Sequence, residues 1–128
     1  MHIAHNPPNV PQPPSKHGQA VESRSGLRWL HISGQIGLDK DGRLADTPLG
    51  QHRQIWANIL NLLAAAGMGR EHLVRVCCYV TSVEQIANYR ITRDEALQGV
   101  EVASTAVVVA ALARPDWVVE MDAVAAAP

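Results

Sequence analysis

The sequence predicts a single α+β domain in which two helices cover one face of a mixed β-sheet. The chain of 128 residues has the usual size of one domain, and its hydrophobic fraction of 47% can supply one core. Its segments follow the order strand, strand, helix, strand, helix, strand, strand. Two helices cover only one face of a sheet of about four to six strands, so the other face needs a different cover.

The chain opens with a proline-rich segment. Five of its eight prolines lie between Pro7 and Pro14, where they disfavour helix and central strand. We therefore expect residues 1–16 to form an extended arm and residues 17–128 to form the single domain. No apolar run reaches the length of a bilayer span, and the start lacks an apolar signal-peptide core. Both observations favour a cytoplasmic protein with no membrane partner.

The first strand of the sheet is predicted over residues 27–33, LRWLHIS, between two glycines. Trp29, His31 and Ser33 alternate along this run and would share one face. The sequence Asp-Lys-Asp-Gly at 39–42 then predicts the turn of a short hairpin or loop.

The first helix has clear signals at both ends. Thr47 followed by Pro48 is typical of an N-cap and a first helical residue, and Gly67 is a natural end. Its apolar residues recur at helical spacing and are Ile55, Trp56, Ile59, Leu60, Leu62, Leu63 and Ala66. The β-branched run that follows at 73–81, LVRVCCYVT, is short enough to be a buried strand.

A second helix is predicted from the capping-box pattern of Ser82 and Gln85 to about Gly99. Its apolar stripe is thin and consists of Ile86, Tyr89, Ala96 and Leu97. We therefore expect only one side of this helix to pack against the protein.

Two further strand-like runs, at 105–112 and 117–125, are joined by a short turn at 114–116, which predicts a hairpin. Both sides of these runs are largely apolar, and the residues concerned include Val107, Val109, Val119 and Met121. An uncovered apolar sheet face predicts an obligate oligomer that buries it. A monomer whose bent sheet closes on itself is the alternative.

Charge and metal-binding residue types argue against several classes of function. A net charge of −1 provides no basic surface for nucleic acid or anionic membrane. The six histidines show no metal-ligand spacing with the cysteines, so we expect no metal site. Cys77 and Cys78 are adjacent in an apolar run, where a mutual disulfide would be strained, so reduced thiols are expected.

Several segments occur in an order that matches one known family. The most distinctive is Ile32-Ser33-Gly34-Gln35-Ile36, which contains a Ser-Gly-Gln-Ile signature. The other matching segments are residues 6–8, 17–21, 51–67, 103–112 and 119–124. Together they span about residues 6–125, and the chain resembles the Rid (reactive intermediate deaminase, YjgF-like) family.

The resemblance implies a chorismate-mutase-like fold and a homotrimer, with the sheets packed into a central barrel and a small-molecule ligand site at each subunit interface. It also implies hydrolysis of an enamine or imine to a 2-oxo acid and ammonia, without a metal or cofactor. An imine carbon is already electrophilic, so the protein needs only to hold the substrate, position water and stabilise proton transfers. The alternative is a trimer of the same fold that binds a metabolite without turnover or serves protein interaction.

Glu120 is the catalytic residue that the resemblance implies. It matches the family glutamate thought to orient or activate water, and it shares a strand face with Asp122. A carboxylate at a sheet interface needs a cation, hydrogen-bond donors or a raised pKa. A structural role, with Glu120 hydrogen-bonded across the trimer interface, remains the alternative.

The anion-binding residue of the family is missing. Its deaminases carry an arginine that clamps the substrate carboxylate, and here the matching position is Ser104, beside Thr105, or Ala103 if the alignment shifts by one residue. A serine supplies no positive charge, which argues against imines derived from amino acids. Arg90 matches a family asparagine that lines the site and could bind an anion instead, or it could belong to the solvated face of the second helix.

Four further positions complete the substrate-binding set that the resemblance implies. His17 stands where the family often has a ligand-contacting tyrosine, although a histidine near an extended arm is often merely exposed. Ser33 and Gly34 would offer a hydroxyl and a backbone donor, although Gly34 also suits the end of a strand. Thr105 joins this set beside Ser104.

Overall fold

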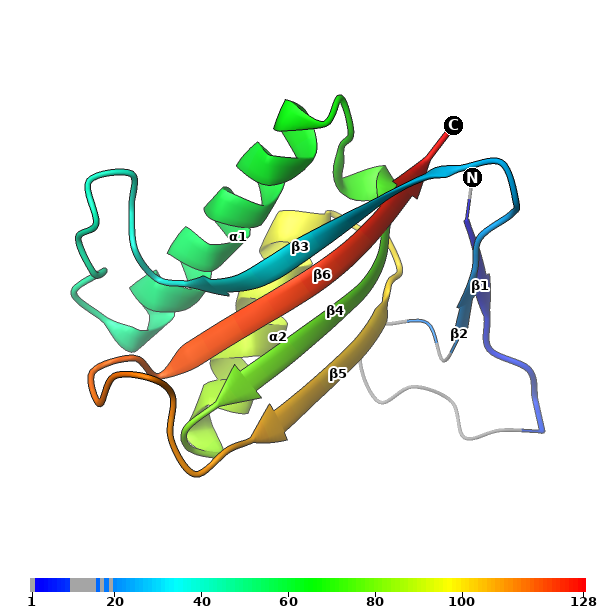
Figure 1. Ribbon diagram of the computed structural model, residues 1–128. Coiled ribbons are helices and arrows are strands. Elements are labelled where there is room, and N and C mark those ends of the chain that lie inside the picture. The colour runs from blue at the N-terminus through cyan, green and yellow to red at the C-terminus, as the bar shows by residue number, and fades with distance from the viewer. Residues whose placement is uncertain (1, 10–15, 17, 19) are drawn as a thin grey trace.

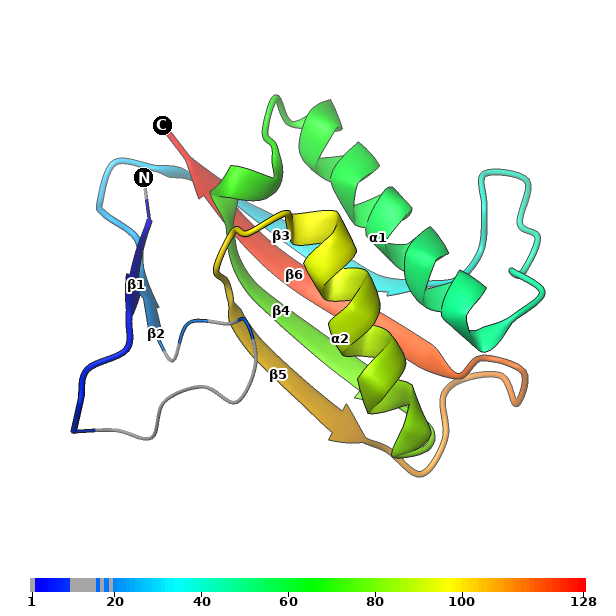
Figure 2. The same cartoon turned by 180° about the vertical axis from the view of Figure 1, so that it is seen from behind.

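The computed structural model describes residues 2–9, 16, 18 and 20–128. One layer is a four-stranded sheet in the order β3-β6-β4-β5, and the helices form the second layer behind it (Figures 1 and 2). The elements of these layers are β3 (Arg28–Ile36), α1 (Pro48–Ala65), the 3-10 helix η1 (Arg70–His72), β4 (Leu73–Val80), α2 (Glu84–Leu97), β5 (Ala103–Val108) and β6 (Val119–Ala127). The α+β class, with α1 and α2 on one face of a mixed sheet, is confirmed.

β6 lies in the interior of the sheet because it pairs on both sides. It runs antiparallel to β3 and to β4, whereas β5 runs parallel to β4 at the sheet edge. The predicted hairpin of the last two strands is therefore wrong, because β4 separates them. The parallel β4–β5 pair is connected through α2, the kind of crossover that parallel strands require. The interior position in turn gives β6 two hydrogen-bonded ladders.

A small two-stranded sheet lies beside the main one. β1 (Ile3–His5) pairs antiparallel with β2 (Ala20–Glu22). The sequence predicted an extended arm over residues 1–16 but not this pairing. The backbone N–H of Gly18 donates to the carbonyl of Val102 at 2.9 Å, which ties the segment to the start of β5.

α1 begins as the sequence predicts. Thr47 is its N-cap, and the Thr47 hydroxyl accepts a hydrogen bond from the N–H of Gly50 at 3.0 Å, with Pro48 as the first residue. Gly67 follows the helix with a φ of +69°, a left-handed conformation that favours glycine. The local signals therefore set both ends of this helix.

α2 does not use the predicted capping box. Val83 occupies its N-cap position, and no side chain caps the helix there. Gln85 instead turns inward, where its Oε1 accepts hydrogen bonds from His52 Nε2 at 3.1 Å and from Asn88 Nδ2 at 3.0 Å. The packing of α2 on α1 therefore uses the Gln85 side chain, which the sequence pattern predicted as part of the N-terminal cap of α2.

The side of the sheet that faces the helices forms the core. Val119 and Met121 are completely buried there, so they do not belong to the uncovered face on which the sequence analysis placed them. The alternation of a strand sends Glu120 and Asp122 to the opposite side of β6.

Cys77 and Cys78 are buried free thiols, and burial raises the pKa of Cys78. Within residues 2–9, 16, 18 and 20–128, no helix is long and apolar enough to cross a membrane. The same residues contain no group of three side chains that could hold a metal ion.

His52 is a buried titratable group at the contact between α1 and α2. It is completely buried, and burial lowers its pKa to about 4 although the hydrogen bond to Gln85 acts in the opposite direction. Its Nδ1 has no hydrogen-bond partner among the described residues. The imidazole is therefore neutral in the folded protein at neutral pH.

Acid should destabilise the fold through His52. The unfolded histidine titrates near pH 6.5 and the folded one near pH 4, so the unfolded state binds more protons between these values. The stabilisation is present above pH 6.5 and is lost as the pH falls toward 4, with a loss of about 2 kcal/mol by pH 5. Urea unfolding at pH 7.5 and pH 5 measures it. His52→Gln, which keeps a donor for Gln85, should reduce the difference by that amount, and an unchanged difference would contradict this assignment.

Candidate functional site

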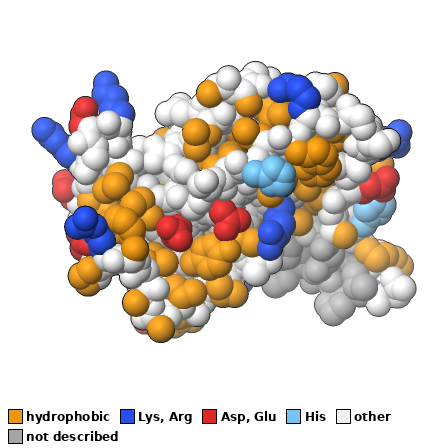
Figure 3. Space-filling model, in the orientation of Figure 1, with side chains coloured by type: hydrophobic (Ala, Val, Ile, Leu, Met, Phe, Trp, Pro, Cys, Tyr) orange, Lys and Arg blue, Asp and Glu red, His pale blue; other side chains and the backbone are white. Residues whose placement is uncertain are grey.

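Among the described residues, no helix or strand covers the sheet face opposite α1 and α2 (Figure 3). The strand pairing places a group of polar side chains on it, namely His31, Arg75, Tyr79, Thr105, Glu120 and Asp122. We call this surface the bare face. Its large exposed apolar residues are Trp29 and Val107, whose residue surfaces are 50% and 42% exposed. The bare face is therefore more polar than the sequence predicted, because the largest apolar residues of β6 point to the core.

A bulge in β3 creates the position of the Glu120 side chain. The β3–β6 register shifts between Ile32 and Gln35, so Ser33 and Gly34 form the irregular part of the strand. A Cβ atom at Gly34 would lie 3.0 Å from Cδ of Glu120 and 3.2 Å from its Oε1. Glycine thus leaves room for the carboxylate to lie against the strand. No hydrogen bond or ion pair connects Glu120 to another described side chain.

Tyr79 and Asp122 form a hydrogen-bonded pair beside Glu120. Tyr79 lies opposite Glu120 in the β4–β6 ladder, and its hydroxyl donates to Oδ2 of Asp122 at 2.8 Å. This hydrogen bond, with a smaller contribution from burial, raises the pKa of Tyr79 to about 12. The phenol therefore remains protonated at neutral pH and keeps Asp122 in place.

An arginine and a histidine lie on the bare face four residues farther along β6 than Glu120. Arg75 on β4 and His31 on β3 lie opposite Val124 on its two sides. Arg75 is exposed and forms no ion pair within the described part of the chain. Along β6 the face therefore changes from acidic at Glu120 to basic beside Val124, and red, blue and pale-blue side chains gather near its centre in Figure 3.

Arg75, Tyr79 and His31 were not predicted as site residues. A signal existed for two of them, because Arg75, Cys77 and Tyr79 alternate along an otherwise apolar strand and so share its outer side. The pairing of that strand with Glu120 was not predictable, since it depends on the insertion of β6 between β3 and β4.

The structure brings together some of the predicted site residues and separates others. Ser33, Gly34, Glu120 and Thr105 all lie on the bare-face side of the sheet. The hydroxyl of Ser104 points to the helix layer instead, where it is hydrogen-bonded to the hydroxyl of Tyr89.

Of the other two predicted site residues, one lies away from Glu120 in this chain and one lies outside the described residues. Arg90 is exposed on α2, in the layer on the other side of the sheet, so it reaches Glu120 only if a second copy brings its own α2 near. The predicted site residue His17 lies outside the described residues.

Comparison with known sequences identifies relatives along most of the chain. A family model described as endoribonuclease L-PSP matches residues 9–127. A RutC family protein from Aquifex aeolicus is 37% identical over 79 residues, which is 61% of each chain and less than two-thirds of that relative's length. A RutC family protein from Pyrococcus horikoshii is 29% identical over 119 residues, which is 91% of each chain.

Solved structures share the fold over nearly its full length. A Rid family protein of unknown function from Yersinia pestis is 32% identical, with 97% of both chains covered and a TM-score of 0.87. RidA from an Antarctic Psychrobacter is 27% identical, with 91% of this chain and 92% of that chain covered and a TM-score of 0.72. The sequence matches, the shared fold and the Ser-Gly-Gln-Ile bulge beside Glu120 agree, and this chain belongs to the Rid/YjgF family.

Proposed function

We propose that this chain is a hydrolase that releases ammonia from a small enamine or imine, in a cleft formed between neighbouring subunits of a homotrimer. The observation that supports this most directly is the carboxylate of Glu120, which has no partner among the described side chains and lies against Gly34 on an uncovered sheet face. A carboxylate in this position is free to accept a proton from water.

The proposed reaction needs a group that accepts a proton from water and neighbouring side chains that hold the reacting centre in place. Protonation of an enamine at carbon gives the iminium ion, and water then adds to the iminium carbon while Glu120 takes a proton from it. Glu120 passes this proton to the nitrogen of the resulting carbinolamine, the C–N bond breaks and ammonia leaves. The hydroxyl group returns its proton to Glu120 as the carbonyl forms, and Glu120 releases that proton to solvent, which replaces the one taken up at carbon. The Tyr79 phenol, protonated at neutral pH, keeps Asp122 hydrogen-bonded beside this centre.

We assign binding of an anionic substrate group to Arg75 in preference to Arg90. Ser104 offers neither charge nor access to the bare face, because its hydroxyl is engaged with Tyr89 behind the sheet. Arg75 is an exposed arginine on the same face as Glu120. A guanidinium binds carboxylates through paired charge-assisted hydrogen bonds.

The description of the family model names endoribonuclease activity, but the charges of this chain favour a small substrate. Glu120 and Asp122 lie side by side on the bare face, and the net charge of the chain is −1. RNA binding depends on neutralising phosphates with basic groups, and two adjacent carboxylates act against it. Binding of a metabolite without turnover is the second candidate, favoured by the serine at position 104.

Glu120→Gln should abolish most of the activity, because glutamine accepts no proton from water. A serine/threonine dehydratase supplies 2-aminoacrylate or 2-aminocrotonate, and release of the 2-oxo acid is followed with and without this protein. We expect a loss of at least about 100-fold in kcat. Glu84→Gln, at an exposed position in the first turn of α2, is the matched control and should retain the activity. If the unaltered protein gives no acceleration, the deaminase proposal fails and ligand binding without turnover becomes the better description.

Arg75→Gln should raise KM for an anionic imine about 10-fold or more, with a smaller effect on kcat, because it removes charge-assisted hydrogen bonds to the substrate. Arg90→Gln is the matched arginine-to-glutamine change on the helix layer and should leave KM nearly unchanged. The reverse result would place the anion beside α2 of a neighbouring subunit and contradict the role of Arg75.

Trp29→Asp should weaken self-association, because it puts a charge on the apolar part of the bare face. Sedimentation of the unaltered protein at micromolar concentration should give particles of three times the chain mass of 13.8 kDa. The variant should shift toward the single chain, whereas Leu62→Asp, at an exposed position on α1, should not. A 13.8 kDa particle for the unaltered protein would overturn the trimer.

A further inference from the structure

We propose that the groove between α1 and α2 is a second binding site, which takes a small organic carboxylate with a short apolar chain. A cavity of about 280 Å³ lies in this groove, and its lining includes Arg53, Trp56, Leu60, Arg70, Glu95 and Ala96. The groove lies between α1 and α2, which form one layer behind the sheet (Figure 2), whereas Glu120 lies on the opposite face of the sheet. The proposal is therefore independent of the reaction proposed for the bare face.

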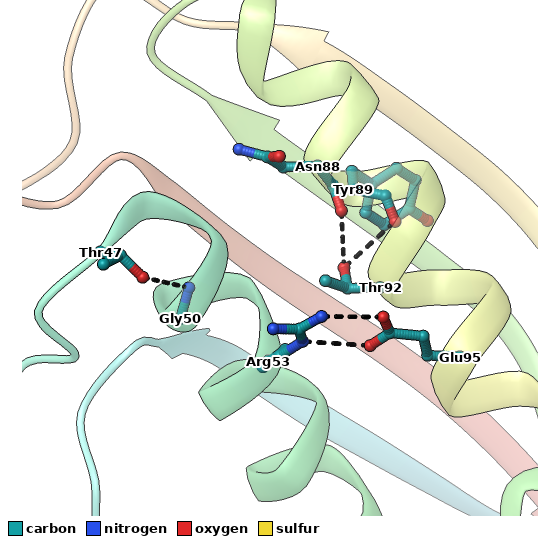
Figure 4. Close-up of polar contacts among 7 residues, drawn as sticks. All are labelled: Thr47, Gly50, Arg53, Asn88, Tyr89, Thr92 and Glu95. Atoms are coloured by element: carbon teal, nitrogen blue, oxygen red, sulfur yellow. Dashed lines mark hydrogen bonds and ion pairs between the residues drawn. The ribbon is translucent and has the colours of Figure 1, made fainter.

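The charges of the groove leave one cation uncompensated. Arg53 and Glu95 join the two helices through paired hydrogen bonds, with Nη2 donating to Oε1 at 3.0 Å and Nε donating to Oε2 at 3.2 Å (Figure 4). These two side chains neutralise each other. Arg70, on η1, has no ion-pair partner within the described part of the chain. The lining thus has a net positive charge that an anion would balance.

Two residues of the lining carry buried hydrogen-bond donors that lack acceptors. Trp56 Nε1 and Arg70 Nη1 are both buried without a partner among the described residues, and Trp56 is only 2% exposed. Both groups can only donate, so each requires an acceptor atom. Arg70 as a whole is only partly buried, which leaves its guanidinium room to turn toward a ligand. A carboxylate combines acceptor oxygens with the negative charge that the groove needs.

The apolar part of the lining favours a ligand with an apolar chain. Ala57, Leu60 and Ala96 provide apolar surface. The hydroxyl of Thr92 already donates to the backbone carbonyls of α2, as Figure 4 shows, so it makes no demand on a ligand. The volume lies just below the range of about 300–1,000 Å³ typical of drug-sized pockets, which suits a molecule of a few carbon atoms. A bare inorganic anion would leave the apolar wall uncovered.

Titration with sodium hexanoate tests the proposal, with the indole N–H signal of Trp56 as the readout in two-dimensional ¹H–¹⁵N NMR. Loss of one indole signal in Trp56→Phe assigns it among the three tryptophans. At constant ionic strength, hexanoate should shift this signal saturably, whereas sodium chloride and neutral hexanamide should not. Arg70→Gln should weaken hexanoate binding about 10-fold or more, because it removes a charged hydrogen-bond donor.

Control variants separate this site from others. Arg90→Gln removes the same charge from an exposed position outside the lining and should leave hexanoate binding unchanged, as should Glu120→Gln on the bare face. Absence of a saturable shift, or a shift that Arg70→Gln does not weaken, would overturn the site. Inorganic phosphate binding as tightly as hexanoate would overturn the assigned ligand class, because the apolar wall would then contribute nothing.

Discussion

The fold depends on one constraint: the interior strand β6 has two faces, and the two helices cover only one of them. Alternation along this strand sends Val119 and Met121 into a closed hydrophobic core and sends Glu120 and Asp122 to the opposite side. The burial that stabilises the domain therefore also fixes the direction of its acidic side chains. A shift of register by one residue would bury both carboxylates and expose both apolar residues.

The neighbours of β6 convert this alternation into an ordered surface. The bulge at Ser33 and Gly34 makes space for the Glu120 carboxylate, and β4 contributes Tyr79 at the acidic level and Arg75 at the basic level. These levels are four residues apart, or about 13 Å along a strand. A long arginine side chain can reach along the strand and bring its guanidinium closer to Glu120 than the backbone spacing. A substrate with an anionic group and a reacting carbon would lie along β6. In the proposed trimer, a second copy would provide the walls of this site.

Contacts between α1 and α2 pair several of the polar groups in the helix layer. His52, Gln85 and Asn88 form a hydrogen-bonded set within it, and Arg53 pairs with Glu95 at its surface. None of these contacts involves the bare face. The two sides of the sheet therefore have separate chemistry, and only the helix layer contains the groove with unpaired donors.

The sequence by itself determined the fold class, the cap of α1 at Thr47, the positive-φ glycine after that helix, and the family. It could do so because caps, turns and periodicity depend on residues a few positions apart, and because the family signals occur as short ordered segments. It also brought Ser33, Gly34 and Glu120 into one candidate site through that resemblance. Only the tertiary structure decided the insertion of β6 between β3 and β4, the inward turn of Ser104 and Gln85, and the placement of Arg75 and Tyr79 on the same face as Glu120. Those features depend on pairing between strands that are far apart in the chain, where local preference does not distinguish one partner or one face from another.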